Sequence, residues 1–228
     1  MPVITRDLLR KRSEHNEGII STMEEVTLHQ EEIEAINEVL GMTCRKLKIL
    51  YLQNNIIRKM ENLNHLKELE YVNLALNNIT KIEGLQNCEF LKKLDMTVNF
   101  VDLDELKSSL EHLQPRDRLR DFYLMGNPAE ANWAGFKTYV IAKLPQLTNL
   151  DGTDITRSML IKAQQELPRL EKELRGLAKL KRAEKAAAAE LVADAKAGKK
   201  KAKEDARVVE LDEHDNEIMV EDASDSED

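Results

Sequence analysis

The sequence is poor in cysteine, proline and aromatic residues. Its 228 residues include two cysteines, five prolines and eight glycines, and aromatic side chains make up 4%. Two cysteines are too few for a fold held together by disulfides. An apolar core must therefore be built from aliphatic side chains, mainly leucine and isoleucine.

Long apolar runs and an excess of positive charge are also missing. No stretch reaches the ~18 apolar residues of a membrane-spanning helix, and the N-terminus, MPVITRDLLRKRSEHNEG, has no apolar signal core. We therefore expect no membrane insertion and no secretory or mitochondrial address, which places the protein in the cytosol or nucleus. The net charge of −8 argues against generic nucleic-acid binding, which needs a basic surface.

What the chain does contain is a repeat. LKILYLQNNIIRKM at 47–60 and LEYVNLALNNITKI at 69–82 match, 22 residues apart, in the frame L-x-x-L-x-L-x-x-N-x-I. A third copy begins 22 residues later, a fourth after a longer interval of 28 residues (119 − 91), and an atypical first copy has Glu31 in place of the asparagine. The residues that fill the frame are Met23, Val26, Leu28 and Ile33; Leu47, Leu50, Leu52, Asn55 and Ile57; Leu69, Val72, Leu74, Asn77 and Ile79; Leu91, Leu94, Met96, Asn99 and Val101; and Leu119, Phe122, Leu124 and Asn127.

This frame predicts an α/β leucine-rich-repeat solenoid of five to six coils. The L-x-L piece is a short strand whose leucines point inward at period two, and the asparagine can bond backbone groups of neighbouring coils. One coil cannot bury its own apolar face, so the coils must stack, with a parallel sheet on the concave face.

The two cysteines fit the same frame. Cys44 and Cys88 each stand three residues before the first leucine of a copy, where the intervening copy has Leu66. We therefore predict that both are small buried apolar residues. Two coils separate them by about 10 Å at a strand spacing of ~4.8 Å, whereas a disulfide needs less than about 7 Å between Cα atoms. The cysteines are expected to be reduced, as in an intracellular protein.

The sequence divides into five segments. We predict an N-terminal capping helix within 1–20, with Thr5 as its N-cap, leucine-rich repeats over 21–135, and a C-terminal cap over 136–153. In the cap, a helix should stop before Pro145 and be followed by a strand-like LTNL and an Asp-Gly turn. A helical, charged extension follows over 154–206. An acidic tail over 207–228 is expected to be disordered.

The extension carries a short heptad seam. Its apolar residues are spaced 3, 4, 3, 4 and 3 apart, for fewer than three heptads, and Pro168 is expected to kink or restart the helix. The seam consists of Leu160, Ala163, Leu167, Leu170, Leu174 and Leu177. Two interpretations stay open: the helix packs on its own cap, or it binds a partner, including a second copy in a coiled coil.

No catalytic constellation is present. The five histidines show no metal-ligand spacing with one another or with a cysteine, and there is no phosphate-binding Gly-x-x-x-x-Gly-Lys loop or Gly-x-Ser-x-Gly elbow. We predict a protein that is not an enzyme and uses no cofactor or metal.

The concave face is the predicted working surface, because its side chains lie between and just beyond the inward leucines. Three of the four tyrosines fall there, next to apolar residues. The candidate protein-binding residues are Ile49, Tyr51, Gln53, Tyr71, Asn73, Leu76, Asp95, Val98, Tyr123 and Met125. Exposed aromatic and apolar side chains favour partner binding; the alternative is that the chain's own C-terminal segment covers them.

A family resemblance extends these expectations. ITRDLLRKRSEHNEG, LHQEEIEAI, LKILYLQNNIIRKMENL, LEYVNLALNNITKIEGL, LDMTVNFV, LMGNP and LPQLTNLDG, in this order, resemble the leucine-rich-repeat dynein axonemal assembly factors of the tilB or seahorse family over residues 3–165. The resemblance implies a non-enzymatic cytoplasmic scaffold that helps to preassemble dynein arms for motile cilia or flagella. It implies dynein subunits, other assembly factors and chaperones as partners, and an association with the cilium, flagellum or basal body. Longer members continue into a domain like the p23/CS co-chaperone fold, so the chain is expected to be a short form lacking that domain or a sequence that is incomplete relative to its relatives.

Two other classes share the repeat. One is the nuclear class of acidic leucine-rich proteins and the splicing factor U2 A-prime, which the acidic tail favours. The other is the phosphatase-regulating repeat proteins, whose solenoids usually have many more coils.

Overall fold

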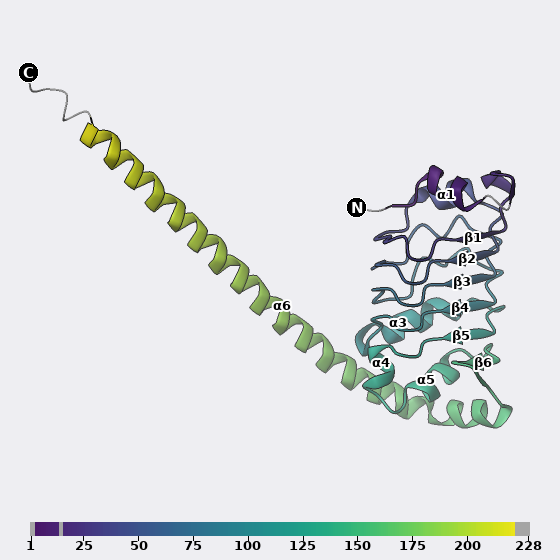
Figure 1. The fold of residues 1–228 in the computed structure, drawn as a ribbon. Helices are drawn as coiled ribbons and strands as arrows, with labels where there is room; N and C mark the ends of the chain where they lie inside the picture. Colours follow the sequence, from purple (N-terminus) through teal and green to yellow (C-terminus); the bar gives the residue numbers. More distant parts are fainter. Residues whose placement is uncertain (1–2, 14–15, 222–228) are drawn as a thin grey trace, which may run out of the picture. The chain divides into compact units, whose positions relative to one another are not determined.

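The computed structural model describes residues 3–13 and 16–221, and for 194–221 it describes the course of the helix only. The chain divides into two units, one ending at Lys179 and one beginning at Leu180. The first unit holds a seven-stranded sheet in which the strands follow chain order, seen in Figure 1 as stacked rungs. These strands are β1 (Glu25–Thr27), β2 (Ile49–Tyr51), β3 (Tyr71–Asn73), β4 (Lys93–Asp95), β5 (Asp121–Tyr123), β6 (Asn149–Leu150) and β7 (Thr153–Asp154).

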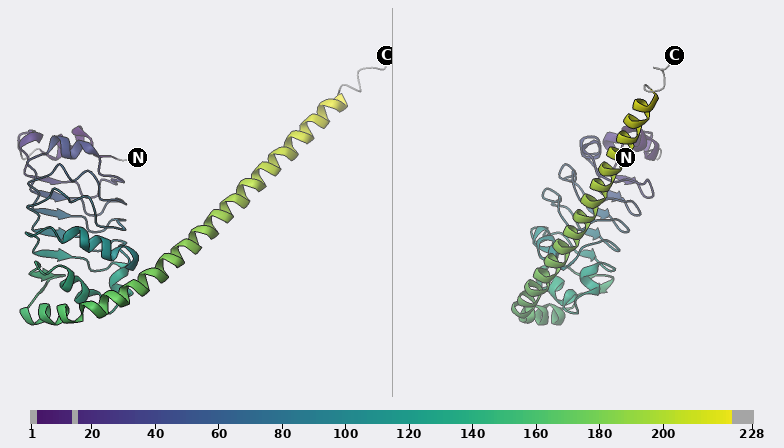
Figure 2. Two further views of the ribbon diagram at one scale, coloured as in Figure 1. Left: turned by 180° about the vertical axis from the view of Figure 1, so that it is seen from behind. Right: turned by 90° about the vertical axis from the view of Figure 1, so that its left-hand side faces the viewer.

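Six strands are parallel, one from each coil, and β7 turns back antiparallel to β6. Helices close the two ends, and α3 lies on the side away from the strands, where the coils after β2 and β3 have turns (Figures 1 and 2). They are α1 (Arg6–Arg12), a 3-10 turn (Ile20–Thr22), α2 (Glu38–Thr43), α3 (Leu103–Leu113), α4 (Pro128–Ala131), α5 (Phe136–Lys143) and α6 (Arg157–Glu221). The predicted leucine-rich-repeat solenoid is confirmed.

The core follows the repeat column by column. In each of the first five strands the central residue is buried and its two neighbours are less buried or exposed, as expected of a sheet with one face inward. The parallel register aligns the central residues Val26, Leu50, Val72, Leu94, Phe122 and Leu150. Stacking of identical positions therefore gives one continuous core.

Both cysteines belong to that core. Cys44 and Cys88 are buried and free. Burial raises the pKa of the Cys44 thiol to about 11 and that of the Cys88 thiol to about 12, so neither is a reactive thiolate at neutral pH. The prediction of two reduced, buried cysteines is confirmed.

A ladder of buried asparagines joins the coils. Asn77 Oδ1 accepts from Ile57 N (3.1 Å) in the preceding coil, while Asn77 Nδ2 donates to Leu52 O (2.9 Å) and to Leu74 O (3.0 Å) in its own coil. The equivalent bonds are made by Asn55 with Ile33, Leu28 and Leu52, by Asn99 with Ile79, Leu74 and Met96, and by Asn127 with Val101, Met96 and Leu124. Asparagine suits the position because its amide supplies an acceptor and two donors at once.

The N-terminal end of the ladder is closed by α1. Thr5 Oγ1 accepts from Leu8 N (3.1 Å), which confirms the predicted N-cap. From the last turn of this helix, Arg12 Nε donates to Glu31 Oε1 (3.0 Å). Glu31 is the residue that replaces the ladder asparagine in the first coil, so a charged pair to the capping helix takes the place of a bond to a preceding coil.

The C-terminal end is closed by Asp151. Elsewhere a residue after each strand donates its N–H to the next strand, as Leu74 N does to Asp95 O (2.8 Å). After β5 that acceptor is replaced by Asp151 Oδ1, which accepts from Leu124 N (2.7 Å) and Met125 N (3.0 Å). Asp151 and Gly152 both have positive φ, 53° and 79°, which confirms the predicted Asp-Gly turn between β6 and β7.

The longer fourth interval contains α3. Its side chains bond the backbone of the preceding coil: Ser109 Oγ accepts from Ile82 N (3.0 Å), and His112 Nε2 accepts from Leu85 N (3.0 Å). An imidazole that accepts at Nε2 is neutral. Burial lowers the pKa of His112, the nearby Arg116 lowers it further, and Glu83 partly opposes the shift.

This histidine predicts a loss of stability in mild acid. The folded state holds His112 with a lowered pKa, so the unfolded state binds the proton more readily, and the free energy of unfolding should fall as the pH drops below about 6.5. In His112→Gln, an amide oxygen can accept from Leu85 N without titrating, so this pH dependence should be reduced. Urea unfolding at pH 7.5 and 5.5 measures it, with His65→Gln, an exposed histidine, as control. Equal pH dependence in His112→Gln and the wild type would contradict the assignment.

The start of α6 packs under the C-terminal cap. Ala163, Leu170 and Leu174 are buried, and the other three seam residues pack against the same core. Trp133 Nε1 donates to Glu173 Oε1 (3.0 Å), and Lys143 pairs with Glu171 (3.3 Å). Of the two open interpretations, the structure shows the helix on its own cap. Homo-oligomerisation through this seam is therefore not supported, because its apolar residues are already covered.

α6 is one continuous helix. Of the two outcomes predicted at Pro168, a kink or a restart, the helix does not restart but runs through the proline, with a bend in the stretch near the cap (Figures 1 and 2). The helical assignment of α6 extends to Glu221, past the predicted boundary at 206, while the disorder expected over 207–228 stays a prediction and 222–228 lie outside the described residues. Alanine, glutamate and lysine have high helix propensity, and over a long window this outweighs the lack of an apolar face.

Candidate functional site: the concave face and its edge

The concave face has an aromatic centre around one lysine. The Tyr51 and Tyr71 rings meet edge to face with their centroids 5.5 Å apart. Lys93 Nζ lies over the Tyr71 ring at 4.8 Å and over the Tyr123 ring at 5.2 Å. These cation–π contacts direct the lysine charge toward the rings and hold the three tyrosines as one cluster. Burial raises the pKa of the Tyr71 phenol, and the nearby Asp95 carboxylate adds to the shift.

Carboxylates surround this aromatic cluster. Among the residues of the seven strands, Lys93 is the one basic side chain, against four acidic ones. The acidic residues are Glu25, Asp95, Asp121 and Asp154. Because the lysine is engaged with two rings, the sheet presents a net negative surface to a partner.

The ten candidate residues divide between the strands and the turns that follow them. Six lie on strands β2 to β5, and the register places Tyr51 beside Asn73, Asn73 beside Asp95, and Asp95 beside Tyr123. Four follow the strands: Gln53, Leu76, Val98 and Met125. The strand residues are half-buried, whereas Leu76, Val98 and Met125 are about half exposed, at 50%, 46% and 46%. The structure therefore brings the candidates together as a concave sheet and one edge of it.

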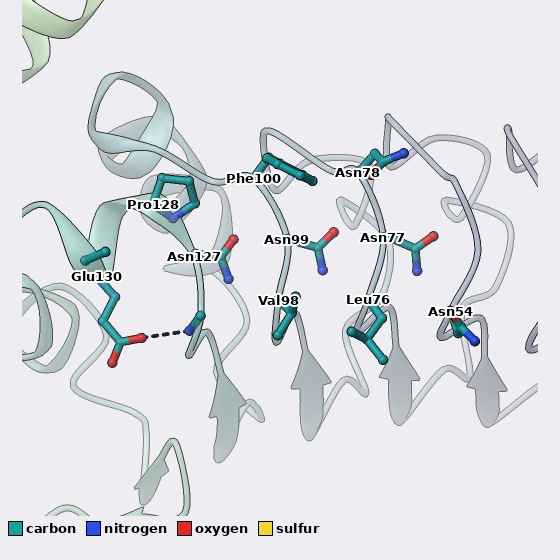
Figure 3. A pocket seen from close by; sticks show the side chains of 12 residues that line it. Asn54, Leu76, Asn77, Asn78, Val98, Asn99, Phe100, Asn127, Pro128 and Glu130 are labelled. Atoms are coloured by element: carbon teal, nitrogen blue, oxygen red, sulfur yellow. Dashed lines mark hydrogen bonds between the residues drawn. The ribbon is translucent and has the colours of Figure 1, made fainter.

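That edge contains a groove of about 660 Å³, which we call the edge groove. It crosses four coils where the strands end, with Leu76 and Val98 on one side and Phe100 and Pro128 on the other (Figure 3). The full lining is Asn54, Leu76, Asn77, Asn78, Val98, Asn99, Phe100, Gly126, Asn127, Pro128, Glu130 and Ala131. The floor is the asparagine ladder, and Glu130 Oε2 accepts from Gly126 N (2.8 Å) at one end.

Sequence reasoning placed Leu76 and Val98 on the binding surface but left Phe100, Pro128 and Lys93 out of the candidate residues. Phe100 and Pro128 occupy the position directly after the ladder asparagine, which is outside the strand. In the four copies that have the ladder asparagine, this position is apolar in three. The residues are Ile56, Asn78, Phe100 and Pro128. Lys93 occupies the strand position that Tyr71 holds in the preceding coil. Aligning the strands of successive coils therefore shows the lysine between Tyr71 and the strand that carries Tyr123.

The described residues contain neither a metal-binding group nor a membrane-spanning helix. None of their histidine, cysteine and acidic side chains form a group of three or more placed to hold a metal ion. In the same part of the chain, no helix has the length and apolar character to cross a membrane. The candidate site is therefore a surface, aromatic and acidic at its centre and apolar at its edge.

Repeated coils, an asparagine ladder and a concave parallel sheet define the class: this is a leucine-rich-repeat protein. The leucine-rich-repeat family profile matches residues 1–170, and the chain belongs to that family.

Within this class the chain is similar to proteins named dynein axonemal assembly factor 11. It is 56% identical to the Danio rerio protein over 164 residues, which are 72% of this chain and 36% of the relative. It is 51% identical to the Homo sapiens protein over 172 residues, 75% of this chain and 36% of the relative. It is 53% identical to Protein tilB of Drosophila melanogaster over 167 residues, 73% of this chain and 41% of the relative. The resemblance to the tilB family is confirmed, and the chain spans 36% to 41% of the length of these relatives.

A solved structure shares the fold at lower identity. A chain in the crystal structure of the Drosophila melanogaster SNF/U2A′ complex is 28% identical, with a TM-score of 0.62. The match covers 76% of this chain and 99% of that chain. Almost the whole of the crystallised chain therefore superposes on the repeat region and caps.

Proposed function

We propose that this protein is a non-enzymatic scaffold in the cytoplasmic preassembly of axonemal dynein arms, needed for motile cilia or flagella. The observation that carries the proposal is the concave face, where three tyrosines and Lys93 form a cluster that the first unit's own helix leaves uncovered. The relatives named dynein axonemal assembly factor supply the process. Dynein subunits, other assembly factors and chaperones are the proposed partners, and the cytoplasm, with the cilium, flagellum or basal body, is the proposed location.

The fold supports a binding role. α6 packs under the C-terminal cap through Leu170 and Leu174, so residues 157–179 do not occupy the concave sheet. The similar chain in the SNF/U2A′ complex was solved in an assembly with another protein. Aromatic side chains held in place by their neighbours are efficient interface anchors, since they lose little conformational entropy on binding.

The splicing-factor-like alternative has weaker support. The chain is 28% identical to its counterpart in the SNF/U2A′ complex but 51% to 56% identical to the assembly factors of Homo sapiens and Danio rerio. Imaging the tagged protein in ciliated cells separates the two proposals, since one expects cytoplasm and basal body and the other expects the nucleus.

A charge-reversal experiment tests the concave face. In Tyr51→Glu/Tyr123→Glu, two carboxylates would replace aromatic anchors on an already acidic sheet, and loss of such anchors typically costs about 2 kcal/mol or more, which is over tenfold in affinity. We expect affinity purification with mass spectrometry from cells growing motile cilia to recover dynein chains and assembly factors with the wild type but not with this variant. Both tyrosines are half-buried, so the fold should lose only about 1 kcal/mol of stability.

The matched control adds the same charge elsewhere. Phe90 and Met42 are exposed and lie off the strands, so Phe90→Glu/Met42→Glu should retain the partners. Equal recovery with a folded Tyr51→Glu/Tyr123→Glu variant would show that the concave face is not the binding surface. Recovery of splicing or chromatin proteins instead would replace dynein assembly with the nuclear alternative.

A further inference from the structure

The edge groove concentrates exposed apolar side chains. Leu76 is 50% exposed, Val98 46% and Phe100 54%, and all three line the groove. Ile56 and Met125 extend the same strip to the neighbouring coils and are also exposed. A contiguous strip of this kind is unusual on a monomer and marks an interaction site.

The backbone of the strip makes these residue choices costly. The residue before each ladder asparagine has a left-handed conformation, with φ of 57° at Asn54, 57° at Leu76, 52° at Val98 and 76° at Gly126. Asparagine and glycine tolerate this conformation, whereas leucine and especially β-branched valine do not. Leu76 and Val98 thus combine backbone strain with solvent exposure, and neither contributes to the core. Strain retained at exposed apolar residues points to a functional use of their side chains.

Gly126 lets the Val98 side chain pack against its backbone. It has no side chain where its neighbours carry leucine and valine, and a Cβ at this position would lie 3.0 Å from Val98 Cγ2. The wall opposite Val98 is formed by Phe100 and Pro128 (Figure 3). A partner's apolar side chain would therefore lie in the groove between Val98 on one side and Phe100 and Pro128 on the other.

The acidic residues near the groove indicate which side chains a partner would carry beside its apolar residues. Asp95 lies on β4, three residues before Val98, and Asp121 lies on β5, five residues before Gly126. Asp95 Oδ1 accepts from Thr97 N (3.0 Å), and the other carboxylate oxygen is free to accept from a partner. At the far end of the groove, Glu130 adds a further carboxylate, paired with Lys137 at 3.4 Å. Acidic groups beside an apolar groove complement a partner that is apolar on one side and basic on the other.

We propose that the edge groove binds an amphipathic helix of a partner protein, with apolar side chains in the groove and lysine or arginine facing Asp95 and Asp121. This inference rests on the proposed scaffold function and names the partner's chemistry. Successive coils repeat every ~4.8 Å, close to the ~5–6 Å between residues i and i+4 on one helix face. Four coils span about 14 Å, which is roughly nine residues of helix.

Peptide selection tests the proposal. A phage-displayed library of random 16-residue peptides is panned on the full chain, with soluble Leu76→Asn/Val98→Asn protein as competitor. We expect enriched peptides with apolar residues at i, i+3 or i+4 and i+7 and a net positive charge. By fluorescence anisotropy they should bind the wild type at least tenfold more tightly than the variant. They should also bind Asp95→Asn/Asp121→Asn more weakly, and all binding should weaken in high salt.

Urea unfolding shows whether Leu76→Asn/Val98→Asn is still folded. Asparagine suits the left-handed backbone, as Asn54 shows in the preceding coil, so Leu76→Asn/Val98→Asn should unfold at the same or higher urea concentration than the wild type. Phe100→Gln is a second variant that leaves the strained positions unchanged and should also lose peptide binding. Enrichment of acidic or uncharged peptides, enrichment that the competitor abolishes, or no enrichment would each overturn the proposal.

The same variants separate this inference from the proposed function. If Tyr51→Glu/Tyr123→Glu loses its cellular partners while Leu76→Asn/Val98→Asn retains them, the scaffold function stands and the groove proposal is wrong. If both retain them, neither the concave face nor the edge groove is the binding surface, and the groove proposal is wrong. Loss of the partners in both, together with basic amphipathic peptides from the library, supports the two proposals together.

Discussion

Asn77→Ala is expected to lower the free energy of unfolding by about 3 kcal/mol. The Ile57 N–H donates a hydrogen bond to Asn77 Oδ1. Without this acceptor it would be left buried and unpaired, which costs about 1–3 kcal/mol. The carbonyls of Leu52 and Leu74 would each lose one donor but keep another, from Asn55 and Asn99. Each such lost bond costs a further ~0.5–1.5 kcal/mol. A change of this size is large beside a total stability of about 5–15 kcal/mol.

Urea unfolding followed by circular dichroism measures this change, with Asn78→Ala as the matched control. Asn78 is the next residue and is half-buried in the groove wall, and its backbone N–H keeps its bond to Ile57 O (2.9 Å). The control should therefore change stability by less than about 0.5 kcal/mol. Because each coil contacts only its neighbours, damage at Asn77 should also broaden the transition as the solenoid divides at a central coil. Equal effects of the two substitutions would refute the ladder as a main source of stability.

Leu170→Asp is expected to cost about 4 kcal/mol and to detach the start of α6 from the cap. Leu170 is fully buried, and an ideal Cβ on Gly135 would lie 2.8 Å from its Cδ2 atom. The substitution removes a large core side chain and places a carboxylate where no basic partner awaits it among Gly135, Trp133 and the leucines of the cap. The uncovered cap would then expose the last coil to water.

Trp133 reports this detachment directly, because it is the only tryptophan in the chain and its indole donates to Glu173 on α6. We expect its fluorescence to shift to longer wavelength and its quenching by iodide to increase in Leu170→Asp. Leu180→Asp makes the same change on the same helix at a residue that is 64% exposed, and it should leave both signals unchanged. An unshifted spectrum in a folded Leu170→Asp variant would mean that α6 does not seal the cap.

Both predictions concern features on which the binding surface depends. The ladder asparagines that hold the coils together are also the floor of the edge groove. The cap helix α5 follows α4, which carries Pro128 and Ala131 of the groove lining. Binding assays on Asn77→Ala and Leu170→Asp therefore need the folded fraction as a correction, whereas the concave-face and groove variants do not remove core contacts.

The repeat itself was predictable because each coil obeys one local rule. Inward leucines at period two, an asparagine at a constant offset and a cysteine in a leucine column leave little freedom, since coils stack only on equivalent coils. The N-cap at Thr5 and the turn at Asp151 were predictable for the same reason, as they depend on short-range backbone chemistry. Leu76 and Val98 could be placed on the surface, since they fall between repeat positions.

The sequence alone therefore determined the solenoid, its caps, its reduced cysteines and the family to which it belongs. Only the tertiary structure decided that the heptad seam around Leu170 packs on the cap, since an apolar stripe has the same spacing whether it covers its own chain or another. Only the structure placed Lys93 between two tyrosines and Phe100 opposite Val98. Such contacts join residues of different coils, and their geometry depends on how the coils stack rather than on any one stretch of sequence.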